Sequence, residues 1–384
     1  MDENGLRLAF VGDVCLSFLG NAPTGTFEFP EWPAIKREIG EYGFLVGNLE
    51  CCLVDAQCSE QARQQTMAVP ATVAGPFLGA IGFSDLTMAN NHSLDCGPEA
   101  VPVTRASLSA YGMRGFGAGL DKHEAEEIAF AERNGHRVAF IGACDKSEFY
   151  AKSDRAGIAP LEKSQLGQRV RAAATQADLV VVALHADLEF SDVPGRWRQR
   201  LSRWLIDQGA HLVIQHHPHV LQGIETYNGG VIAYSLGNFI FKLRGNRYQE
   251  RRAGVFDSMV LVVDANLRGP QPALAYRIVP LSIGDQHLPR CVSGHEGEEA
   301  IRRVQALSSM VADKRAHRRL WLRRCKSEAV SRMRIIFYAF VRGHFARGGE
   351  RYGPCCLAER IAGGSSGWFR WVICEVGKRR HHAP

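Results

Sequence analysis

Five apolar segments of this chain end abruptly in residues that bind metal ions or carry protons. Each segment is short and apolar, as expected of a buried β-strand. In α/β proteins, ligands bind beyond the carboxyl ends of the strands. A chain with this pattern therefore has to fold so that several strand ends meet. The polar residues that follow the segments are Asp13; Asn48 and Glu50; Asn90, Asn91 and His92; His185; and His216, His217 and His219.

The last segment, residues 212–215, leads into three histidines within four positions. His217 and His219 are two residues apart, so in an extended backbone their side chains project to the same side. A divalent metal needs neutral nitrogen donors held on one side at a fixed distance, and this spacing supplies two. Histidines also cluster by accident on surfaces, so this pattern alone leaves both interpretations open.

The other strand ends have ordinary structural explanations when each is taken alone. Asp13 suits a turn or a helix cap, Glu50 suits a solvated position, and His185 suits a buried histidine bonded to the backbone. Core packing does not readily explain all five ends together. The coincidence favours one shared polar site.

Helical segments alternate with the strands, which predicts an α/β fold. The spacing of apolar residues predicts helices over 98–111 and 195–208. The pair Asn228-Gly229, between two apolar runs, is typical of a hairpin turn and predicts a second sheet with antiparallel strands.

Longer blocks surround the polar residues. They are Gly12-Asp13, Gly47-Asn48-Leu49-Glu50, Asn90-Asn91-His92-Ser93-Leu94-Asp95-Cys96-Gly97, His216-His217-Pro218-His219 and Tyr234-Ser235-Leu236-Gly237-Asn238-Phe239. Over about residues 6–283, this set and its order resemble the CapA family of poly-γ-glutamate capsule biosynthesis proteins, whose domain is related to calcineurin-like metallophosphoesterases. The resemblance implies two packed β-sheets flanked by helices, an αββα sandwich of metallophosphoesterase type with its metal site at the strand ends.

The resemblance also implies a site for one or two divalent metal ions. A mixture of carboxylate, amide and imidazole ligands suits manganese, iron or zinc better than calcium or magnesium. Two metals about 3.5–4 Å apart need a bridging carboxylate, for which Glu50 is the candidate. The residues that match the family's metal positions are Asp13, Glu50, Asn91, His185, His217 and His219.

The resemblance implies catalytic roles for two further residues. His92 matches the histidine that protonates a leaving group or stabilises the transferring phosphoryl group in the wider superfamily. Asp95 either orients His92 or caps the helix expected near Pro98. The candidates for substrate contact are Asn48, Glu189, His216 and Asn238.

Three positions depart from the family pattern. The first strand ends in Asp13-Val14-Cys15 where phosphoesterases typically carry Asp-x-His. Cys15 either replaces the histidine as a thiolate or is a small core residue. The run from His185 to Glu189 lacks the family's His-Trp-Gly, and Gln215 replaces a common glycine. We expect these last two changes to alter substrate contacts and local backbone rather than metal binding.

The overall charge of +6 conceals an uneven distribution. From residue 301 onward there are 19 Lys and Arg against 5 Asp and Glu, a net charge of +14, which leaves −8 for residues 1–300. We predict a CapA-like metallophosphoesterase domain over 1–290 and a basic extension over 291–384, helical over 298–338 and then irregular. The extension either packs its apolar stripe on the domain or docks on an anionic membrane or polymer.

Composition places the chain among globular proteins, with 46% hydrophobic and 22% charged residues. No run reaches the roughly 18 apolar residues that span a bilayer, and the N-terminus does not resemble a secretory signal. Eleven cysteines, an odd number without zinc-ribbon spacing, are expected to stay reduced. These features predict a cytoplasmic protein, held at most peripherally at the inner face of the membrane.

Two classes of function fit this sequence. One is a metal-dependent hydrolase acting on an ester or amide bond of an anionic polymer or a phosphorylated small molecule, in poly-γ-glutamate or related surface-polymer metabolism. The other is a non-catalytic accessory subunit of a capsule polymer synthesis or export complex. His92 and the intact ligand set favour the hydrolase, because a structural metal site needs no acid or base. No nucleic-acid partner is expected, because no nucleic-acid-binding module is visible.

Overall fold

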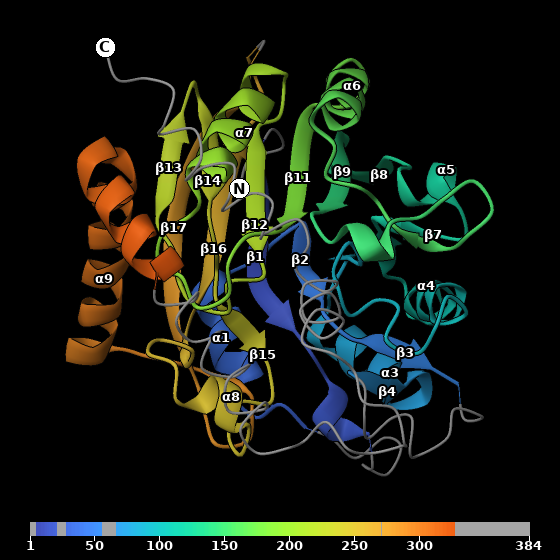
Figure 1. The fold of residues 1–384 in the computed structure, drawn as a ribbon, viewed down its shortest axis with the longest axis horizontal. Coiled ribbons are helices and arrows are strands. Elements are labelled where there is room, and N and C mark those ends of the chain that lie inside the picture. The colour runs from blue at the N-terminus through green and yellow to red at the C-terminus, as the bar shows by residue number, and fades with distance from the viewer. Residues whose placement is uncertain (1–4, 21–27, 56–66, 270, 327–384) are drawn as a thin grey trace, which may run out of the picture. The chain divides into compact units, whose positions relative to one another are not determined.

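Two β-sheets pack face to face and carry the polar strand ends noted above (Figure 1). A computed structural model describes residues 5–20, 28–55, 67–269 and 271–326. Within these residues, the first sheet has eight strands, in the order β18-β17-β16-β1-β2-β5-β6 with β15 also paired to β1. Their bounds are β1 (Gly5–Val14), β2 (Phe44–Leu49), β5 (Asp85–Thr87), β6 (Arg114–Phe116), β15 (Asn238–Ile240), β16 (Asp257–Asn266), β17 (Ala273–Ile283) and β18 (Pro289–Cys291).

The second sheet has six described strands, in the order β13-β14-β12-β11-β9-β8. Two short ladders, β3-β4 and β7-β10, lie outside the main sheets. The bounds of these strands are β8 (Ala129–Arg133), β9 (His136–Cys144), β11 (Leu179–His185), β12 (Leu212–His216), β13 (Ile224–Tyr227), β14 (Gly230–Ala233), β3 (Cys52–Val54), β4 (Ala68–Pro70), β7 (Ala118–Gly119) and β10 (Gly157–Ile158).

Helices cover the outer faces of the two sheets, so the layers run α, β, β, α. Helices α1, α3 and α4 pack on the first sheet, and α6 and α7 pack on the second. The expected α/β architecture of two sheets flanked by helices is confirmed. The described helices are α1 (Trp32–Ile39), α3 (Ala71–Ile81), α4 (Ala100–Ala110), α5 (Lys122–Ala125), α6 (Lys163–Ala174), α7 (Arg196–Asp207), α8 (Arg247–Glu250) and α9 (Gly294–Ala312), with 3-10 turns at Ser17–Leu19 and Ser147–Phe149.

Alternating side chains along β1 explain the layering. Leu8 and Phe10 are buried between the two sheets, whereas Ala9 and Val11 face the helices. Successive side chains of a strand lie on opposite faces, so a strand that is apolar at every position can serve two cores. Burial of each large aliphatic or aromatic side chain contributes roughly 1.5–3 kcal/mol.

Parallel pairing brings the polar strand ends to one edge of the sandwich. Strands β1, β2 and β5 run parallel in the first sheet, as β9, β11 and β12 do in the second. The register sets Asp13 beside Asn48, and His185 beside His216. The fold therefore meets the requirement stated from the sequence, that several strand ends converge.

The helices and the hairpin expected from local patterns are confirmed. The segments 98–111 and 195–208 contain α4 and α7, within two residues of the expected bounds. Asn228 and Gly229 join β13 to β14, with φ values of 46° and 80°. Both residues therefore adopt the left-handed conformation that a tight hairpin turn requires.

The basic extension begins with two helical segments rather than one. Helix α9 ends at Ala312, and a second helical segment occupies 314–326. The Asp313 carboxylate accepts hydrogen bonds from the backbone N–H groups of Arg315 and Ala316 and so caps the second segment. The remainder of the expected helix, 327–338, lies outside the described residues.

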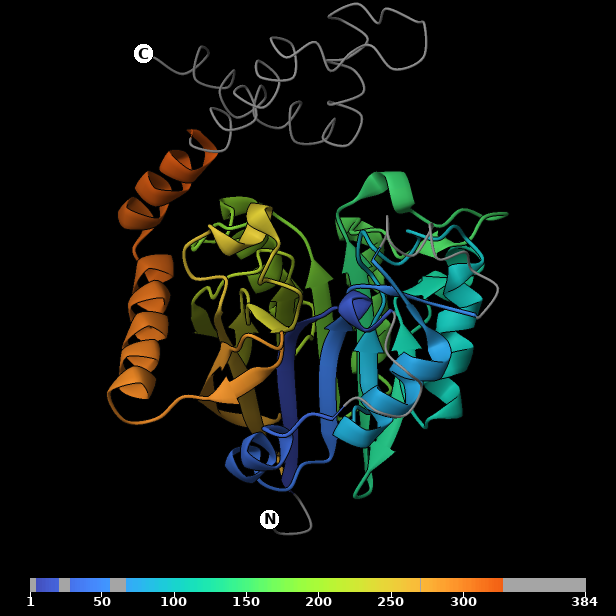
Figure 2. The ribbon, with the colours of Figure 1, turned by 90° about the horizontal axis from the view of Figure 1, so that it is seen from below.

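Helix α9 packs on the edge of the sandwich formed by β13 and β17 (Figure 2). Its Val304 and Leu307 are buried in the core between the sheets, and Trp321 farther along is also buried. The compact unit that contains the sheets runs through Trp321, and Leu322 begins a second unit. The boundary expected near residue 290 stays a prediction. No helix among the described residues combines the length and apolar content needed to cross a membrane.

Candidate metal centre

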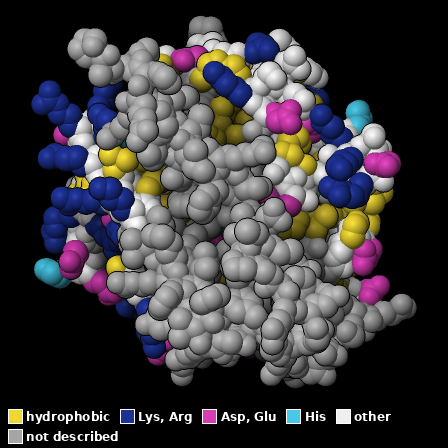
Figure 3. All heavy atoms as spheres, in the orientation of Figure 1, with side chains coloured by type: hydrophobic (Ala, Val, Ile, Leu, Met, Phe, Trp, Pro, Cys, Tyr) yellow, Lys and Arg dark blue, Asp and Glu magenta, His cyan; other side chains and the backbone are white. Residues whose placement is uncertain are grey.

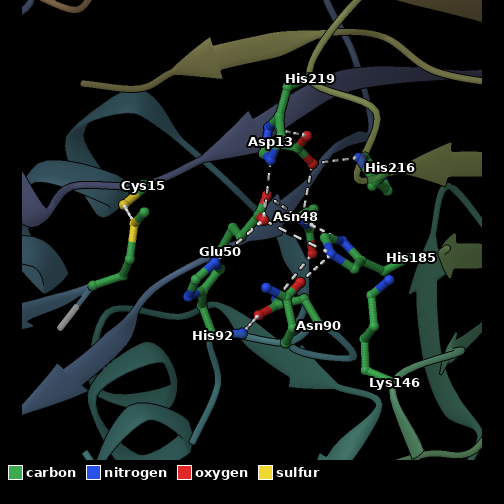
Figure 4. Close-up of polar contacts among 12 residues, drawn as sticks. Asp13, Cys15, Asn48, Glu50, Asn90, His92, Lys146, His185, His216 and His219 are labelled. Atoms are coloured by element: carbon green, nitrogen blue, oxygen red, sulfur yellow. Dashed lines mark hydrogen bonds and ion pairs between the residues drawn. The ribbon is translucent and has the colours of Figure 1, made fainter. Parts of the chain in front are cut away.

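The expected metal ligands meet beyond the strand ends (Figure 4). Three groups of side chains offer ligand atoms that all lie within 4.8 Å of one another. Glu50 belongs to two of them, which fits the bridging position proposed for it. The groups are Glu50, His185 and His217; Asp13, Glu50 and His219; and Glu189, His217 and His219.

Asp13 and Glu50 are the two carboxylates at the centre of the site, and both are fully buried. Asp13 lies 3.2 Å from Nδ1 of His216 and 3.3 Å from Nδ1 of His219. Glu50 Oε1 lies 3.6 Å from Nε2 of His219 and 3.7 Å from Nε2 of His185. Asp13 Oδ2 and Glu50 Oε1 nevertheless have no hydrogen-bond partner. Each carboxylate thus faces two imidazoles with an oxygen available to a cation.

Asn48 connects the carboxylates, although the sequence suggested a substrate contact for it. Its side chain is fully buried, and Nδ2 lies 2.9 Å from Asp13 Oδ1, 3.4 Å from Glu50 Oε2 and 3.3 Å from Nδ1 of His185. Nδ2 of Asn90 donates to Asn48 Oδ1 at 3.1 Å and so fixes the orientation of that amide. Asn48 is therefore placed to hold the candidate ligands, and its expected contact with a substrate stays a prediction.

The histidine loop corrects one expectation. Strand β12 ends at His216, and His217 and His219 have φ values of 94° and 57°. The extended backbone expected there is wrong, and the two side chains converge through left-handed positions on either side of Pro218. Such a conformation costs of the order of 1–3 kcal/mol for a residue other than glycine and is concentrated at functional sites.

Two other predicted residues surround this loop. The Asn238 carboxamide is fully buried, with Oδ1 3.0 Å from Nδ1 of His219, and its Nδ2 donates to the His219 carbonyl. Asn91 Oδ1 lies 2.7 Å from Nε2 of His185. Asn238, proposed from the sequence as a substrate contact, is thus placed to orient His219, and Asn91 contacts the candidate ligand His185.

The burial of the site separates the protonation states of its imidazoles. Burial lowers the pKa of His185 and His217 well below the ordinary value, so both rings are neutral and able to donate lone pairs. Burial also acts on His219, but the negative charges of Glu50 and Asp13 outweigh it and raise the pKa of His219 to about 10.

The two carboxylates are shifted in opposite directions. Burial would raise the pKa of Asp13, but the close contacts with His216 and His219 and their positive charge hold this pKa well below the usual range. Burial and the neighbouring Asp13 charge raise the pKa of Glu50. Asp13 therefore stays ionised beside a protonated His219, and its negative charge can attract a cation.

His92 and Asp95 form a pair at the edge of the site. His92 Nδ1 lies 3.0 Å from Asp95 Oδ2, which also accepts the backbone N–H of Met67. His92 Nε2 lies 4.0 Å from Glu50 Oε1, and 24% of the His92 side chain is exposed. The residue at the start of α4 is Glu99, so the structure favours the orienting role of Asp95 over a cap.

Cys15 is not among the candidate ligands. Its side chain is fully buried in the first-sheet core, with Sγ 3.3 Å from both Ser17 Oγ and Met67 Sδ. It belongs to none of the metal-binding groups found among the described residues. The core interpretation of Cys15 is therefore the one that the structure supports.

Arg198 of α7 contacts residues that adjoin the candidate metal site. The sequence did not predict this role. The side chain is fully buried. Its guanidinium contacts Ala186 O (2.5 Å), Tyr234 O (3.0 Å), Asp187 Oδ2 (3.3 Å) and Gln215 Oε1. Gln215, which the sequence marked as a departure from the family pattern, accepts a hydrogen bond from this arginine through its side-chain oxygen. Helical arginines usually point to solvent, so no local signal marks Arg198 as buried.

The side chains present fit a divalent metal ion. Buried polar atoms without partners cost about 1–3 kcal/mol each, and Asp13 Oδ2, Glu50 Oε1 and His217 Nδ1 are three such atoms in one site. One or two cations bound by the groups described above would give these side chains partners. Carboxylates with neutral imidazoles are typical ligands of manganese, iron and zinc.

The fold and the site define an α/β protein of two sheets with a candidate metal centre at its strand ends. The chain belongs to the family described as bacterial capsule synthesis protein PGA_cap, whose model matches residues 7–243. The expected membership of the CapA family is confirmed.

Two CapA proteins are similar to this chain in sequence. The chain is 32% identical over 248 residues to the PGA biosynthesis protein CapA of Bacillus subtilis (strain 168), a match that covers 62% of this chain and 64% of that protein. It is 33% identical over 166 residues to the capsule biosynthesis protein CapA of Bacillus anthracis, covering 42% of this chain and 40% of that protein. The matches thus span less than two-thirds of either relative.

Solved structures resemble the chain more distantly. A putative 5'-nucleotidase from Staphylococcus aureus, crystallised with alpha-ketoglutarate, aligns over 79% of this chain and 58% of that chain, with a TM-score of 0.48 and 12% identity.

Proposed function

We propose that this protein is a metal-dependent hydrolase that cleaves an ester or amide bond of an anionic substrate, in the metabolism of poly-γ-glutamate or a related surface polymer. Two features together carry this proposal. Buried oxygen and nitrogen atoms that could bind a metal lack hydrogen-bond partners, and a partly exposed histidine lies beside them. The metal-binding atoms alone would be consistent with a structural ion. The adjoining acid or base is what hydrolysis requires.

Asp13, Glu50, His185, His217 and His219 would hold one or two ions of manganese, iron or zinc. A bound divalent ion supplies a Lewis acid and lowers the pKa of a bound water. The buried surroundings keep competing solvent away from these donors, since all five side chains are nearly inaccessible.

His92 would protonate the leaving group. Asp95 binds its Nδ1, so that Nε2 is the atom turned toward Glu50 and the site. Partial exposure allows His92 to exchange its proton with solvent between turnovers. A positioned acid of this kind typically contributes about 10²–10⁴-fold to the rate.

Metal analysis followed by a substrate screen tests the proposal. Protein purified without chelators should contain manganese, iron or zinc and should hydrolyse a phosphomonoester, a phosphodiester or a γ-glutamyl peptide. Glu50→Gln should lose metal and activity together, whereas Glu132→Gln, on the exposed part of β8, should keep both. Failure of the wild type to take up any of these metals would overturn the proposal.

An accessory role is the second candidate. Two Mycobacterium tuberculosis relatives, 26% identical over 230 residues, carry the name "probable polyglutamine synthesis accessory protein". In that case Glu50→Gln would impair polymer production and His92→Ala would not. Loss of production in both variants supports the hydrolase.

The basic extension is proposed to attach the protein to an anionic polymer or membrane surface. Lys and Arg side chains gather on the side of the molecule where α9 lies (Figure 3). Each basic residue near an anionic bilayer contributes about 1 kcal/mol. A few of the 19 Lys and Arg after residue 300 would therefore suffice for peripheral binding.

A further inference from the structure

Lys146 lies beside the candidate ligands, although no sequence motif includes it. It follows β9, whose end pairs with that of β11 so that Cys144 is in register with His185. Figure 4 shows the Lys146 ammonium directed toward His185. Only 24% of the side chain is exposed, so the charge lies at the site rather than in bulk solvent.

A short chain of contacts holds this ammonium in place. Lys146 Nζ lies 3.3 Å from Asp145 Oδ1, and Asp145 Oδ2 accepts the backbone N–H of Asp187 at 3.0 Å. Burial would lower the pKa of Lys146, but the charge of Asp145 outweighs it, so the lysine stays protonated at neutral pH. The positive charge also contributes to the lowered pKa of His185 and His217.

A protonated lysine disfavours metal binding nearby unless an anionic group binds beside it. It has no lone pair to donate and repels the incoming cation. Asp145 alone does not explain the position, since this carboxylate could pair with a lysine that points away from the ligands. An ammonium beside a divalent ion is, however, well suited to bind an oxyanion that also contacts the metal.

We propose that Lys146 is a specificity-determining residue that binds an oxyanion group of the substrate, either a phosphoryl or a carboxylate group. This inference rests on the proposed function and narrows its substrate to one that carries the negative charge next to the scissile bond. Asp145 is then a positioning residue that fixes the ammonium.

Binding measurements on the full-length Mn²⁺-loaded protein test this assignment apart from turnover. The probes are inorganic phosphate and the dipeptide γ-glutamylglutamate, titrated by calorimetry into the wild type, Lys146→Gln, Lys146→Arg and the control Lys152→Gln, which alters an exposed lysine. Because hydrogen bonds to charged groups are strong, Lys146→Gln should weaken binding of the preferred anion about 10- to 100-fold. Lys146→Arg should retain most of the affinity, and Lys152→Gln should match the wild type.

The affinity for Mn²⁺ separates binding from a structural role. In Lys146→Gln it should be unchanged or higher, because a repelling charge has been removed. Loss of Mn²⁺ together with the anion would show a structural role and overturn the inference, as would wild-type anion affinity in Lys146→Gln or no anion binding by the wild type. Tighter binding of phosphate or of the dipeptide identifies the oxyanion. Mn²⁺ binding without hydrolysis of any substrate would count against the hydrolase and leave these measurements valid.

Discussion

The buried ion pair of Arg198 and Asp187 offers a direct test of how the fold holds the site. Asp187 is two residues beyond the candidate ligand His185, and Arg198 lies on α7 behind it. Arg198→Met keeps much of the side-chain volume and removes the charge. Loss of one partner from a buried pair costs about 3–5 kcal/mol, because the other charge stays buried alone. Proteins are typically stable by only about 5–15 kcal/mol, so this variant should lose a large share of its folding free energy.

The loss of folding free energy in Arg198→Met should depend on pH. Burial raises the pKa of Asp187 to about 6, although Arg198 opposes the shift. Without Arg198 the pKa of Asp187 in the folded protein should rise further, while its pKa in the unfolded chain stays at about 3.9. A carboxyl group with a raised folded pKa stabilises the fold at low pH and loses that contribution as the pH rises through the folded value. The stability gap between wild type and Arg198→Met should therefore be smaller at about pH 5 than at about pH 8.

Guanidinium unfolding followed by circular dichroism measures this gap, and Mn²⁺ titration measures the effect on the site. Mn²⁺ affinity should fall in Arg198→Met, because the ends of β11 and β12 lose their common anchor. Adding Asp187→Asn removes the stranded charge, so the double variant should recover about 1–3 kcal/mol relative to the sum of the single variants. A loss below about 1 kcal/mol at both pH values, or simple additivity, would refute the reasoning.

Three further predictions concern the acid, the metal and the extension. His92→Ala should lower turnover about 10²–10⁴-fold and leave the metal content unchanged in elemental analysis, whereas loss of metal would reassign His92 as a ligand. Mn²⁺ binding should release protons, because the metal must displace a proton that His219 holds at neutral pH. Burial lowers the pKa of His219, but the charges of Glu50 and Asp13 outweigh this effect and raise it to about 10. Calorimetry in buffers of different ionisation enthalpy measures that release, and an affinity independent of pH between about 6 and 8 would contradict it. Removal of residues 322–384 should preserve metal content and abolish salt-sensitive cosedimentation with anionic vesicles or poly-γ-glutamate. Absence of cosedimentation by the full-length protein would contradict this prediction.

Local patterns were sufficient to predict the five strands that end at the site and to nominate the residues that gather there. Asp13, Glu50 and His185 each follow an apolar run, and parallel strands deliver such positions to one edge whatever the strand order. The backbone of the histidine loop was not predictable in this way. The left-handed φ values of His217 and His219 depend on how the loop packs against its surroundings, whereas the expectation used only their spacing.

Lys146 and Arg198 were missed for a different reason. Lys146 reaches the site because β9 pairs with β11 in a particular register, and strand order is not encoded in either strand alone. Arg198 lies among the arginines of α7, and only the tertiary packing shows that this one is buried. The break at Asp313 was also missed, because apolar residues continue at helical spacing on both sides of it.

The distribution of charge suits the two tasks of the proposed function. Residues 1–300 carry −8 and repel a polyanion, but salt screens this repulsion beyond about 8 Å at physiological ionic strength. Within the site, Lys146 and a bound cation would offset the carboxylates and admit one anionic group. The +14 carried after residue 300 is of the sign that captures a long polyanion and raises its local concentration. Capture of the polymer and recognition of a single bond would then be separate functions, so that removal of residues 322–384 would abolish capture and keep recognition.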